Sequence, residues 1–261
     1  MNKTIKNLLN DFSKISEIEA ILLAGSHSTG TVDKNSDYDI YIYSNSQIPI
    51  HKRKSITDKY FKYIELSNTY WEEEDDGILF DDTEVEFIYR NIDSIDNSLN
   101  RTLIKCEADI GYTTCIWYNL KNSIIIYDKN DKLSSLQSKY DIEYPNELRN
   151  NIIEKNFNLL KSKFPCYYKQ IEKAIKRNDY VSLNHRLAAF LASYFDIIFA
   201  YNKCPHPGEK KILEFIKNNN LLTPLNMEKN ILNAFNYAGT NDPKLLSELD
   251  NLTNNLIDLL R

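Results

Sequence analysis

The chain has 261 residues, with 32 basic and 37 acidic side chains and a formal net charge of −5. This length allows a buried hydrophobic core in one large domain or in two smaller ones. The acidic balance argues against a protein that holds a long nucleic acid, because such proteins usually carry a basic face.

The cysteines and the apolar segments predict a protein of the cytoplasm. Cys106, Cys115, Cys166 and Cys204 are far apart, form no CxxC pair and follow no secretory leader, so we expect reduced and mostly buried thiols. No apolar run approaches the ~18 residues that a membrane span needs. We therefore expect no membrane partner, and the sequence predicts no oligomeric state.

Helical and strand-like patterns alternate over the first 127 residues. Apolar side chains from Ile5 to Ile15 recur at spacings of three and four, which predicts an amphipathic helix. Runs rich in β-forming residues predict strands over 18–24, 38–43 and 84–89. Residues 52–66 look helical, and the acidic stretch from Glu72 to Asp76 interrupts the pattern as an exposed loop.

After residue 143 the patterns are helical throughout. The predicted helices cover 146–163, 166–177, 179–203, 208–219, 224–237 and 243–260. Residues 182–201 are apolar almost all round, which is typical of the central helix of a bundle. The predicted fold is an α+β domain, residues 1–143, with a mixed sheet and flanking helices, followed by an all-α helical-bundle domain, residues 144–261.

Two aspartates and a glycine-serine pair in AGSHSTGTVDKNSDYDIYIY suggest a metal-phosphate site. Asp37 and Asp39 are two residues apart on a predicted strand, so both side chains leave the same face of a sheet. Neighbouring carboxylates repel each other unless a cation lies between them, and Mg²⁺ prefers oxygen ligands of this kind. Gly25 and Ser26 follow a strand directly, where a turn can hold a phosphate through backbone N–H groups and a hydroxyl.

A third carboxylate would allow the site to hold metal and to accept a proton from an attacking hydroxyl. Glu86 lies in the middle of a predicted strand, between Val85 and Phe87. Glu84 points to the same face and is the competing candidate. We favour Glu86, because its apolar neighbours indicate a rigid position in mid-strand.

These motifs resemble the signature of the polymerase-β-type nucleotidyltransferase superfamily. The matching residues are LLAGSHSTGTVDKNSDYDIYI followed by VEF. Antibiotic-modifying members, such as streptomycin and kanamycin nucleotidyltransferases, join this domain to a helical one. The segments EVEFIYRNIDSID, YPNELRNNI and NKCPHPGEKKIL are similar to a bacterial branch with a C-terminal domain of unknown function. The resemblance spans most of the chain.

The resemblance implies a role for each matching residue. Gly25 and Ser26 would bind the phosphates of ATP or another nucleoside triphosphate, and Asp37, Asp39 and Glu86 would hold Mg²⁺, with Glu86 also acting as general base. The family's common arginine after the Gly-Ser turn is absent, because His27-Ser28-Thr29 stand there. Two lysines of the helical part could supply that positive charge to the nucleotide, namely Lys210 and Lys211.

The implied reaction is transfer of a nucleoside monophosphate, AMP from ATP in the first instance, to a hydroxyl of a small acceptor such as an aminoglycoside or a related antibiotic. The acidic stretch from Glu72 to Asp76 has a second interpretation as an electrostatic lure for such a polycation. Two alternative functions are a protein adenylyltransferase of the toxin-neutralising type and a nucleotide-binding sensor without activity.

Three other residues have two interpretations each. Trp71 and Trp117 could stack on a base or a sugar, but we predict core packing for both. His206 could contact a phosphate or cap its turn, and the sequence does not decide between these roles.

Overall fold

The structure is a computed structural model that describes residues 1–30 and 36–261, so residues 31–35 of the Gly-Ser segment lie outside the described residues. The chain divides into two compact units. One contains residues 1–100 and 116–142, and the other contains residues 101–115 and 143–261. The domain limit expected from the sequence, between residues 143 and 144, stays a prediction.

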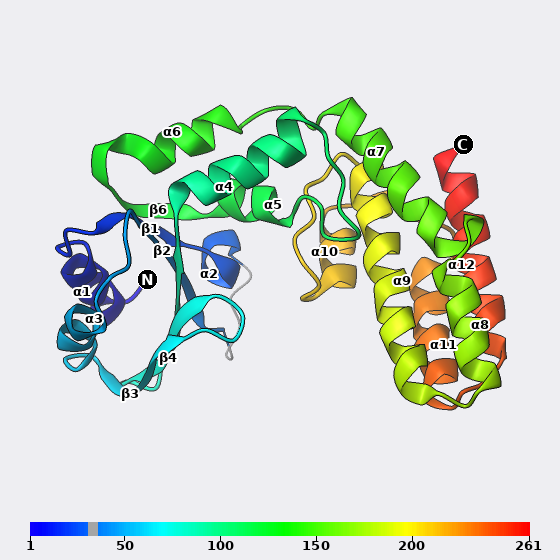
Figure 1. Ribbon diagram of the computed structural model, residues 1–261, viewed down its shortest axis with the longest axis horizontal. Coiled ribbons are helices and arrows are strands. Elements are labelled where there is room, and N and C mark those ends of the chain that lie inside the picture. The colour runs from blue at the N-terminus through cyan, green and yellow to red at the C-terminus, as the bar shows by residue number, and fades with distance from the viewer. Residues whose placement is uncertain (31–35) are drawn as a thin grey trace. The chain divides into compact units, whose positions relative to one another are not determined.

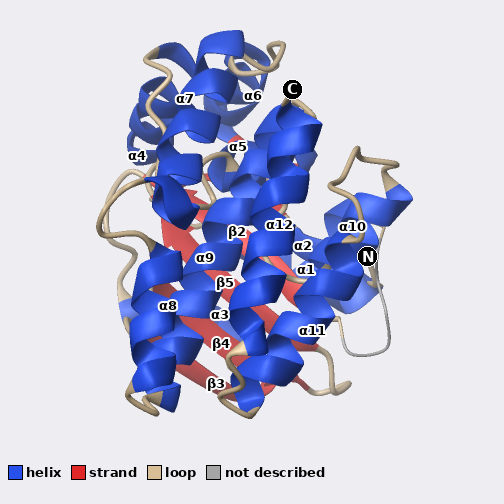
Figure 2. Cartoon of the chain, turned by 90° about the vertical axis from the view of Figure 1, so that its right-hand side faces the viewer, coloured by secondary structure: helices blue, strands red, loops and turns tan. Residues whose placement is uncertain are grey.

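The first unit contains a mixed six-stranded sheet with helices (Figure 1), as the sequence predicts. The strand order is β3-β4-β5-β2-β1-β6, and Figure 2 shows β2, β5, β4 and β3 side by side. Among the described strand pairs, β2 and β5 run parallel and the others run antiparallel. Its elements are α1 (Lys3–Phe12), β1 (Ile18–Leu23), α2 (Gly25–Thr29), β2 (Tyr38–Ser44), α3 (Ile50–Thr57), β3 (Phe61–Asn68), β4 (Glu73–Leu79), β5 (Glu84–Arg90), α4 (Ile92–Leu99), α5 (Cys115–Asn122), β6 (Ile124–Asp128), a 3₁₀ helix (Lys129–Asp131) and α6 (Lys132–Lys139). A π-helix (Asn100–Ile104) follows α4, and its residues from Arg101 onward belong to the second unit, as does Cys115 at the start of α5.

One face of this sheet is buried in the core. Helix α1 contributes four buried side chains at spacings of three and four, as its sequence pattern predicts, and the Phe12 ring stacks on Phe87 of β5 at 4.7 Å between centroids. Ile40 and Ile42 of β2 are buried in the same hydrophobic cluster as Phe87. Because strand side chains alternate, the intervening residues, Asp39 on β2 and Glu86 on β5, lie on the opposite face.

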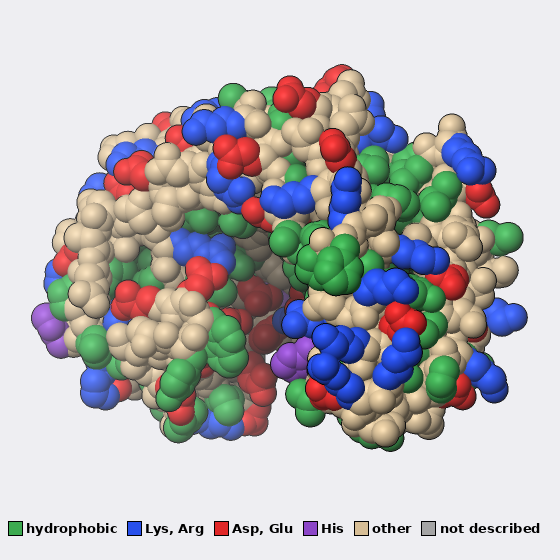
Figure 3. Space-filling view, turned by 45° about the vertical axis from the view of Figure 1, so that its right-hand side comes forward, with side chains coloured by type: hydrophobic (Ala, Val, Ile, Leu, Met, Phe, Trp, Pro, Cys, Tyr) green, Lys and Arg blue, Asp and Glu red, His purple; other side chains and the backbone are tan. Residues whose placement is uncertain are grey.

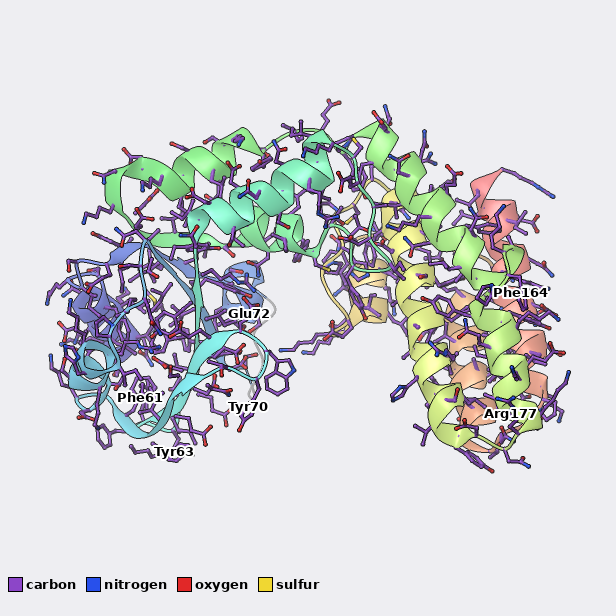
Figure 4. All side chains as sticks on the ribbon, viewed as in Figure 1. Phe61, Tyr63, Tyr70, Glu72, Phe164 and Arg177 are labelled. Carbon is purple, nitrogen blue, oxygen red and sulfur yellow. The ribbon has the colours of Figure 1, made fainter. Side chains whose placement is uncertain are left out.

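The prediction of a helix over 52–66 followed by an acidic loop is wrong. Helix α3 ends at Thr57, and a hairpin of β3 and β4 occupies the rest of this segment. Figure 4 labels Phe61 and Tyr63 on β3, and Tyr70 and Glu72 at the turn of the hairpin. Sequence patterning missed the hairpin because charged residues are rare in strands.

A buried ion pair explains how β4 accommodates its charges. Arg53 of α3 is fully buried and donates to Asp75 at 3.0 Å and to Glu73 at 3.0 Å. The Tyr89 hydroxyl and the backbone N–H of Ser67 also donate to Asp75, at 2.6 and 2.7 Å. The carboxylates of β4 that face this side are thus paired and hydrogen-bonded, which is the condition for burying charge.

The second unit is helical, as predicted. Its helices are α7 (Asn146–Phe157), α8 (Tyr167–Lys176), α9 (Tyr180–Tyr201), α10 (Ile212–Asn218), α11 (Met227–Gly239) and α12 (Lys244–Leu260), with a π-helix (Asn158–Ser162) after α7. Every residue of α9 from Ser193 to Ala200 is buried, which confirms the predicted central helix. None of the described helices has both the length and the apolar composition that a membrane span requires.

Candidate active site

Three of the predicted site residues come together on two adjacent strands. Asp39 of β2 is the register partner of Glu86 of β5, and Asp37 precedes β2 by one residue. Carboxylate oxygens of these three residues all lie within 4.8 Å of one another. Register partners project to the same face of a sheet, so this grouping follows directly from the parallel pairing of β2 and β5.

Gly25 and Ser26 begin the short helix α2 rather than a plain turn. The backbone here is joined to β2, because the N–H of Ala24 donates to the carbonyl oxygen of Asp39 at 2.9 Å. Gly25 has a φ of +60°, and a Cβ atom on it would lie 1.7 Å from Oδ2 of Asp39. The Asp39 carboxylate therefore occupies the space that the side chain of any residue other than glycine would fill at position 25.

Gly25→Ala is expected to lower any activity of this site by about a hundredfold, because the Asp39 carboxylate must shift to admit the new methyl group. A steady-state activity assay measures the effect. Gly30→Ala is the matched control, since Gly30 also has a positive φ, +75°, but no atom lies within 4 Å of the position that a Cβ atom would take there. Equal activity losses in the two variants would show that backbone strain, and not the contact with Asp39, is responsible.

Two further carboxylates, which the sequence singles out only as part of an acidic stretch that could attract a polycation, lie on the same face. Asp76 of β4 is the register partner of Glu86 on its other side, and Glu74 follows on the same face of β4. Oxygens of Glu74, Asp76 and Glu86 also lie within 4.8 Å of one another. Every residue from Glu72 to Asp76 is acidic, so the sequence has no alternation that separates Glu74 and Asp76 from their neighbours. Figure 3 shows Asp and Glu side chains gathering in one area of this unit's surface.

The carboxyl group of Glu86 is the most perturbed member of this set. Burial and, after it, the negative charges of Asp39, Asp76, Glu74 and Asp37 together raise its pKa to about 7. In the metal-free protein this carboxyl group therefore holds its proton to a higher pH than an ordinary glutamate does. Glu84 is exposed. The groups of carboxylates whose oxygens lie within 4.8 Å of one another contain Glu86 and not Glu84.

The raised pKa predicts that the metal-free protein loses stability as pH rises. Folded Glu86 keeps its proton up to a pH of about 7, whereas the unfolded side chain releases it near its ordinary value of 4.5. The folded state therefore binds more protons between these values, and the free energy of unfolding falls as pH rises through this window. Because Glu86 is partly exposed, we expect this titration to lower the free energy of unfolding of the wild type by about 1 to 2 kcal/mol. The variant Glu86→Gln should not show this decrease.

Urea denaturation in EDTA at pH 5 and pH 8 measures this difference for the wild type, Glu86→Gln and the control Glu84→Gln. The expected result is a smaller change between the two pH values in Glu86→Gln than in the other two proteins. The same pH dependence in all three would contradict the assignment of the titration to Glu86.

The donor set fits Mg²⁺. All candidate ligands among the described residues of this group are carboxylate oxygens, which are the hard donors that Mg²⁺ selects. The mutual repulsion that helps to raise the pKa of Glu86 is the unfavourable energy that a bound divalent cation would remove.

The same face carries a cation four residues beyond Glu86. Arg90 donates through Nε to Glu72 at 2.7 Å, and its guanidinium lies 4.3 Å from the centroid of the Tyr41 ring. Arg90 is thus held by a bidentate pair and by a cation–π contact, which favour a fixed orientation.

Lys210 and Lys211 lie in the second unit, at exposed positions immediately before α10. Their binding of a nucleotide stays a prediction. The role of His206 is clearer, because its side chain is fully buried and its Nδ1 atom accepts the N–H of Gly208 at 3.0 Å. Burial lowers the pKa of His206 to about 4, so the ring is neutral at pH 7 and caps its turn instead of binding a phosphate.

The two tryptophans differ in their surroundings. Trp117 is 2% exposed and donates through Nε1 to the carbonyl oxygen of Tyr140 at 2.9 Å, which confirms core packing. Trp71 is 84% exposed, so the prediction of core packing is wrong for it. The error has the same origin as the missed hairpin, because Trp71 lies in the turn between β3 and β4.

The sequence matches two known domain families. Residues 5–107 match the family described as nucleotidyltransferase domain, and residues 115–211 match a domain of unknown function, DUF4037. No curated protein matches the chain.

Three solved structures resemble the chain at low identity. A nucleotidyltransferase-like protein from Exiguobacterium sibiricum 255-15 is 10% identical with a TM-score of 0.42, over 99% of this chain and 73% of the other. An aminoglycoside 6-adenyltransferase from Bacillus subtilis is 10% identical with a TM-score of 0.29, over 100% and 92%. A spectinomycin adenyltransferase from Enterococcus faecialis, solved with ATP and spectinomycin, is 15% identical with a TM-score of 0.33, over 96% and 98%.

Proposed function

We propose that this chain, whose residues 5–107 match the nucleotidyltransferase domain family, transfers AMP from ATP to a hydroxyl group of a small acceptor in an Mg²⁺-dependent reaction. The observation that carries this proposal is the cluster of Asp37, Asp39 and Glu86, with the Gly25 backbone packed against Asp39. Pyrophosphate is the leaving group.

Each residue of the cluster has a proposed task. Asp37 and Asp39 hold Mg²⁺, with Glu86 as the third ligand, and the bound ion would neutralise phosphate charge during transfer. Glu86 accepts the proton of the acceptor hydroxyl at its carboxylate, which makes the oxygen a better nucleophile for in-line attack on the α-phosphorus. Gly25 and Ser26 bind the phosphates that leave, and Lys210 and Lys211 add positive charge to nucleotide binding.

The sheet face that carries Glu74, Asp76 and Glu86, here called the acidic face, favours a cationic acceptor such as an aminoglycoside or a related antibiotic. Glu74 and Asp76 add two carboxylates beside Glu86, beyond the three that the proposed metal site uses. Grouped charges of one sign attract a ligand of the opposite sign and raise its local concentration. An acceptor with ammonium groups therefore suits this face better than a neutral or anionic one.

A labelling screen tests the proposal. The protein is incubated with nucleoside triphosphates labelled at the α-phosphorus, Mg²⁺, and either aminoglycosides, lincosamides or a cell extract. The expected result is a labelled small molecule that forms with ATP. Label on protein bands alone would favour the protein adenylyltransferase alternative, and nucleotide binding without any labelled product would favour the inactive sensor.

A further inference from the structure

Two adjacent aromatic side chains are held out into solvent at the turn between β3 and β4. Tyr70 is 86% exposed and Trp71 is 84% exposed, and their rings meet edge to face at 6.5 Å between centroids. Figure 4 shows the Tyr70 ring projecting from the end of the hairpin. Exposing two large rings contributes nothing to the hydrophobic stabilisation of the fold, whereas aromatic side chains commonly provide contact area for ligands.

Hydrogen bonds on both sides of this pair order the turn. The N–H of Tyr70 donates to Oδ1 of Asn68 at 3.1 Å, and the amide nitrogen of Asn68 donates to Asp76 at 3.2 Å. On the other side, Glu72 accepts two hydrogen bonds from Arg90. The rings are therefore presented from a fixed backbone, which lowers the entropy lost when a ligand binds.

The same hydrogen bonds join the aromatic pair to the acidic face. Asn68 links Tyr70 to Asp76, which is the register partner of Glu86. Four residues separate Trp71 from Asp76, so at ~3.3 Å per strand residue the two positions are at most about 17 Å apart along β4. A ligand of two or three sugar rings can reach from the one to the other.

We propose that Tyr70 and Trp71 form a docking platform for the acceptor, and that this acceptor is an amino sugar whose ring lies on the aromatic side chains while its ammonium groups face Asp76, beside the buried Glu74. This inference rests on the proposed function, which identifies the bound ligand as the acceptor. Charge complementarity selects this occupant over an anionic one, because the carboxylates of β4 would repel a phosphate or a nucleic acid.

Binding of kanamycin, a polyamino sugar, tests the platform without nucleotide and without turnover. The chain has two tryptophans, and Trp117 is buried, so a change in tryptophan fluorescence on titration reports on the exposed Trp71. We expect a saturable change in the wild type, and none with the neutral disaccharide trehalose. Calorimetry with Trp71→Ala should show binding about tenfold weaker, the equivalent of one lost ring contact.

Trp71→Phe tests the ring contact with kanamycin separately from the fluorescence change, because it keeps an aromatic ring and removes the exposed fluorophore. It should bind kanamycin by calorimetry nearly as well as the wild type does, with the fluorescence change abolished. Phe80→Ala is the matched control, since Phe80 is an exposed aromatic residue at the other end of β4 and should leave affinity unchanged.

Unchanged affinity in both Trp71→Ala and Tyr70→Ala would overturn the platform, as would equal binding of trehalose or no binding of kanamycin by the wild type. These outcomes are independent of catalysis. Kanamycin binding that depends on Trp71 in a protein without transferase activity would refute the proposed function alone, and AMP transfer with the same acceptor KM in Trp71→Ala would refute the platform alone.

Discussion

Asp39→Asn should release pyrophosphate from ATP at least about a thousandfold more slowly than the wild type, with a thermal unfolding temperature that is equal or higher. The activity falls because the amide is a poor ligand for Mg²⁺ at the centre of the carboxylate cluster. Stability is retained because the substitution removes one of several negative charges that repel each other. A coupled pyrophosphate assay with saturating acceptor, together with a thermal melt, measures both quantities.

Asp58→Asn is the control for this experiment. Asp58 follows α3, and its side chain is 56% exposed in an ion pair with Lys54. The variant therefore also loses one negative charge, at a position that does not belong to the carboxylate cluster. It should retain full activity. Full activity in Asp39→Asn as well would remove Asp39 from the proposed mechanism.

Arg53→Met should lower the free energy of unfolding by about 3 to 5 kcal/mol, the typical cost of removing one partner of a buried ion pair. Asp75 is fully buried beside Arg53, and without the guanidinium its charge has no compensating cation at this position. The loss arises on the core face of β4, opposite Glu74 and Asp76. Urea denaturation monitored by circular dichroism measures the change.

Lys54→Met is the neighbouring control. Lys54 pairs with Asp58 at the surface, where both side chains are more than half exposed. Exposed ion pairs contribute about 0 to 1 kcal/mol, so the control should unfold nearly as the wild type does. Similar destabilisation by the two substitutions would show that helix α3, rather than the buried ion pair, determines the result.

The carboxylate cluster was predictable because its signals are local. The spacing of Asp37 and Asp39 fixes a common face, and the apolar neighbours of Glu86 indicate a strand interior. The sequence alone could not predict that β2 and β5 are neighbours, since strand pairing is set by the whole sheet. In the structure this pairing places Glu86, rather than Glu84, opposite Asp39.

The β3–β4 hairpin was not predictable because its support is distant in sequence. The charges of Glu73 and Asp75 argue against a strand, and the compensating Arg53 lies 20 and 22 residues earlier on another element. The missed hairpin also hid the strand face on which Glu74 and Asp76 lie, and the exposed position of Trp71. Local patterns thus predict the proposed metal ligands, whereas the proposed acceptor surface depends on tertiary contacts.

We propose that Asp37, Asp39 and Glu86 together support a metal-dependent transfer of AMP. Its most direct test is the transfer of label from ATP labelled at the α-phosphorus to the acceptor found in the screen, by the wild-type protein in Mg²⁺ and in EDTA. We predict a labelled product that requires Mg²⁺ and that disappears in Asp37→Asn. Product formation that continues undiminished in EDTA, or in Asp37→Asn with Mg²⁺, would contradict a metal-dependent transfer at these carboxylates.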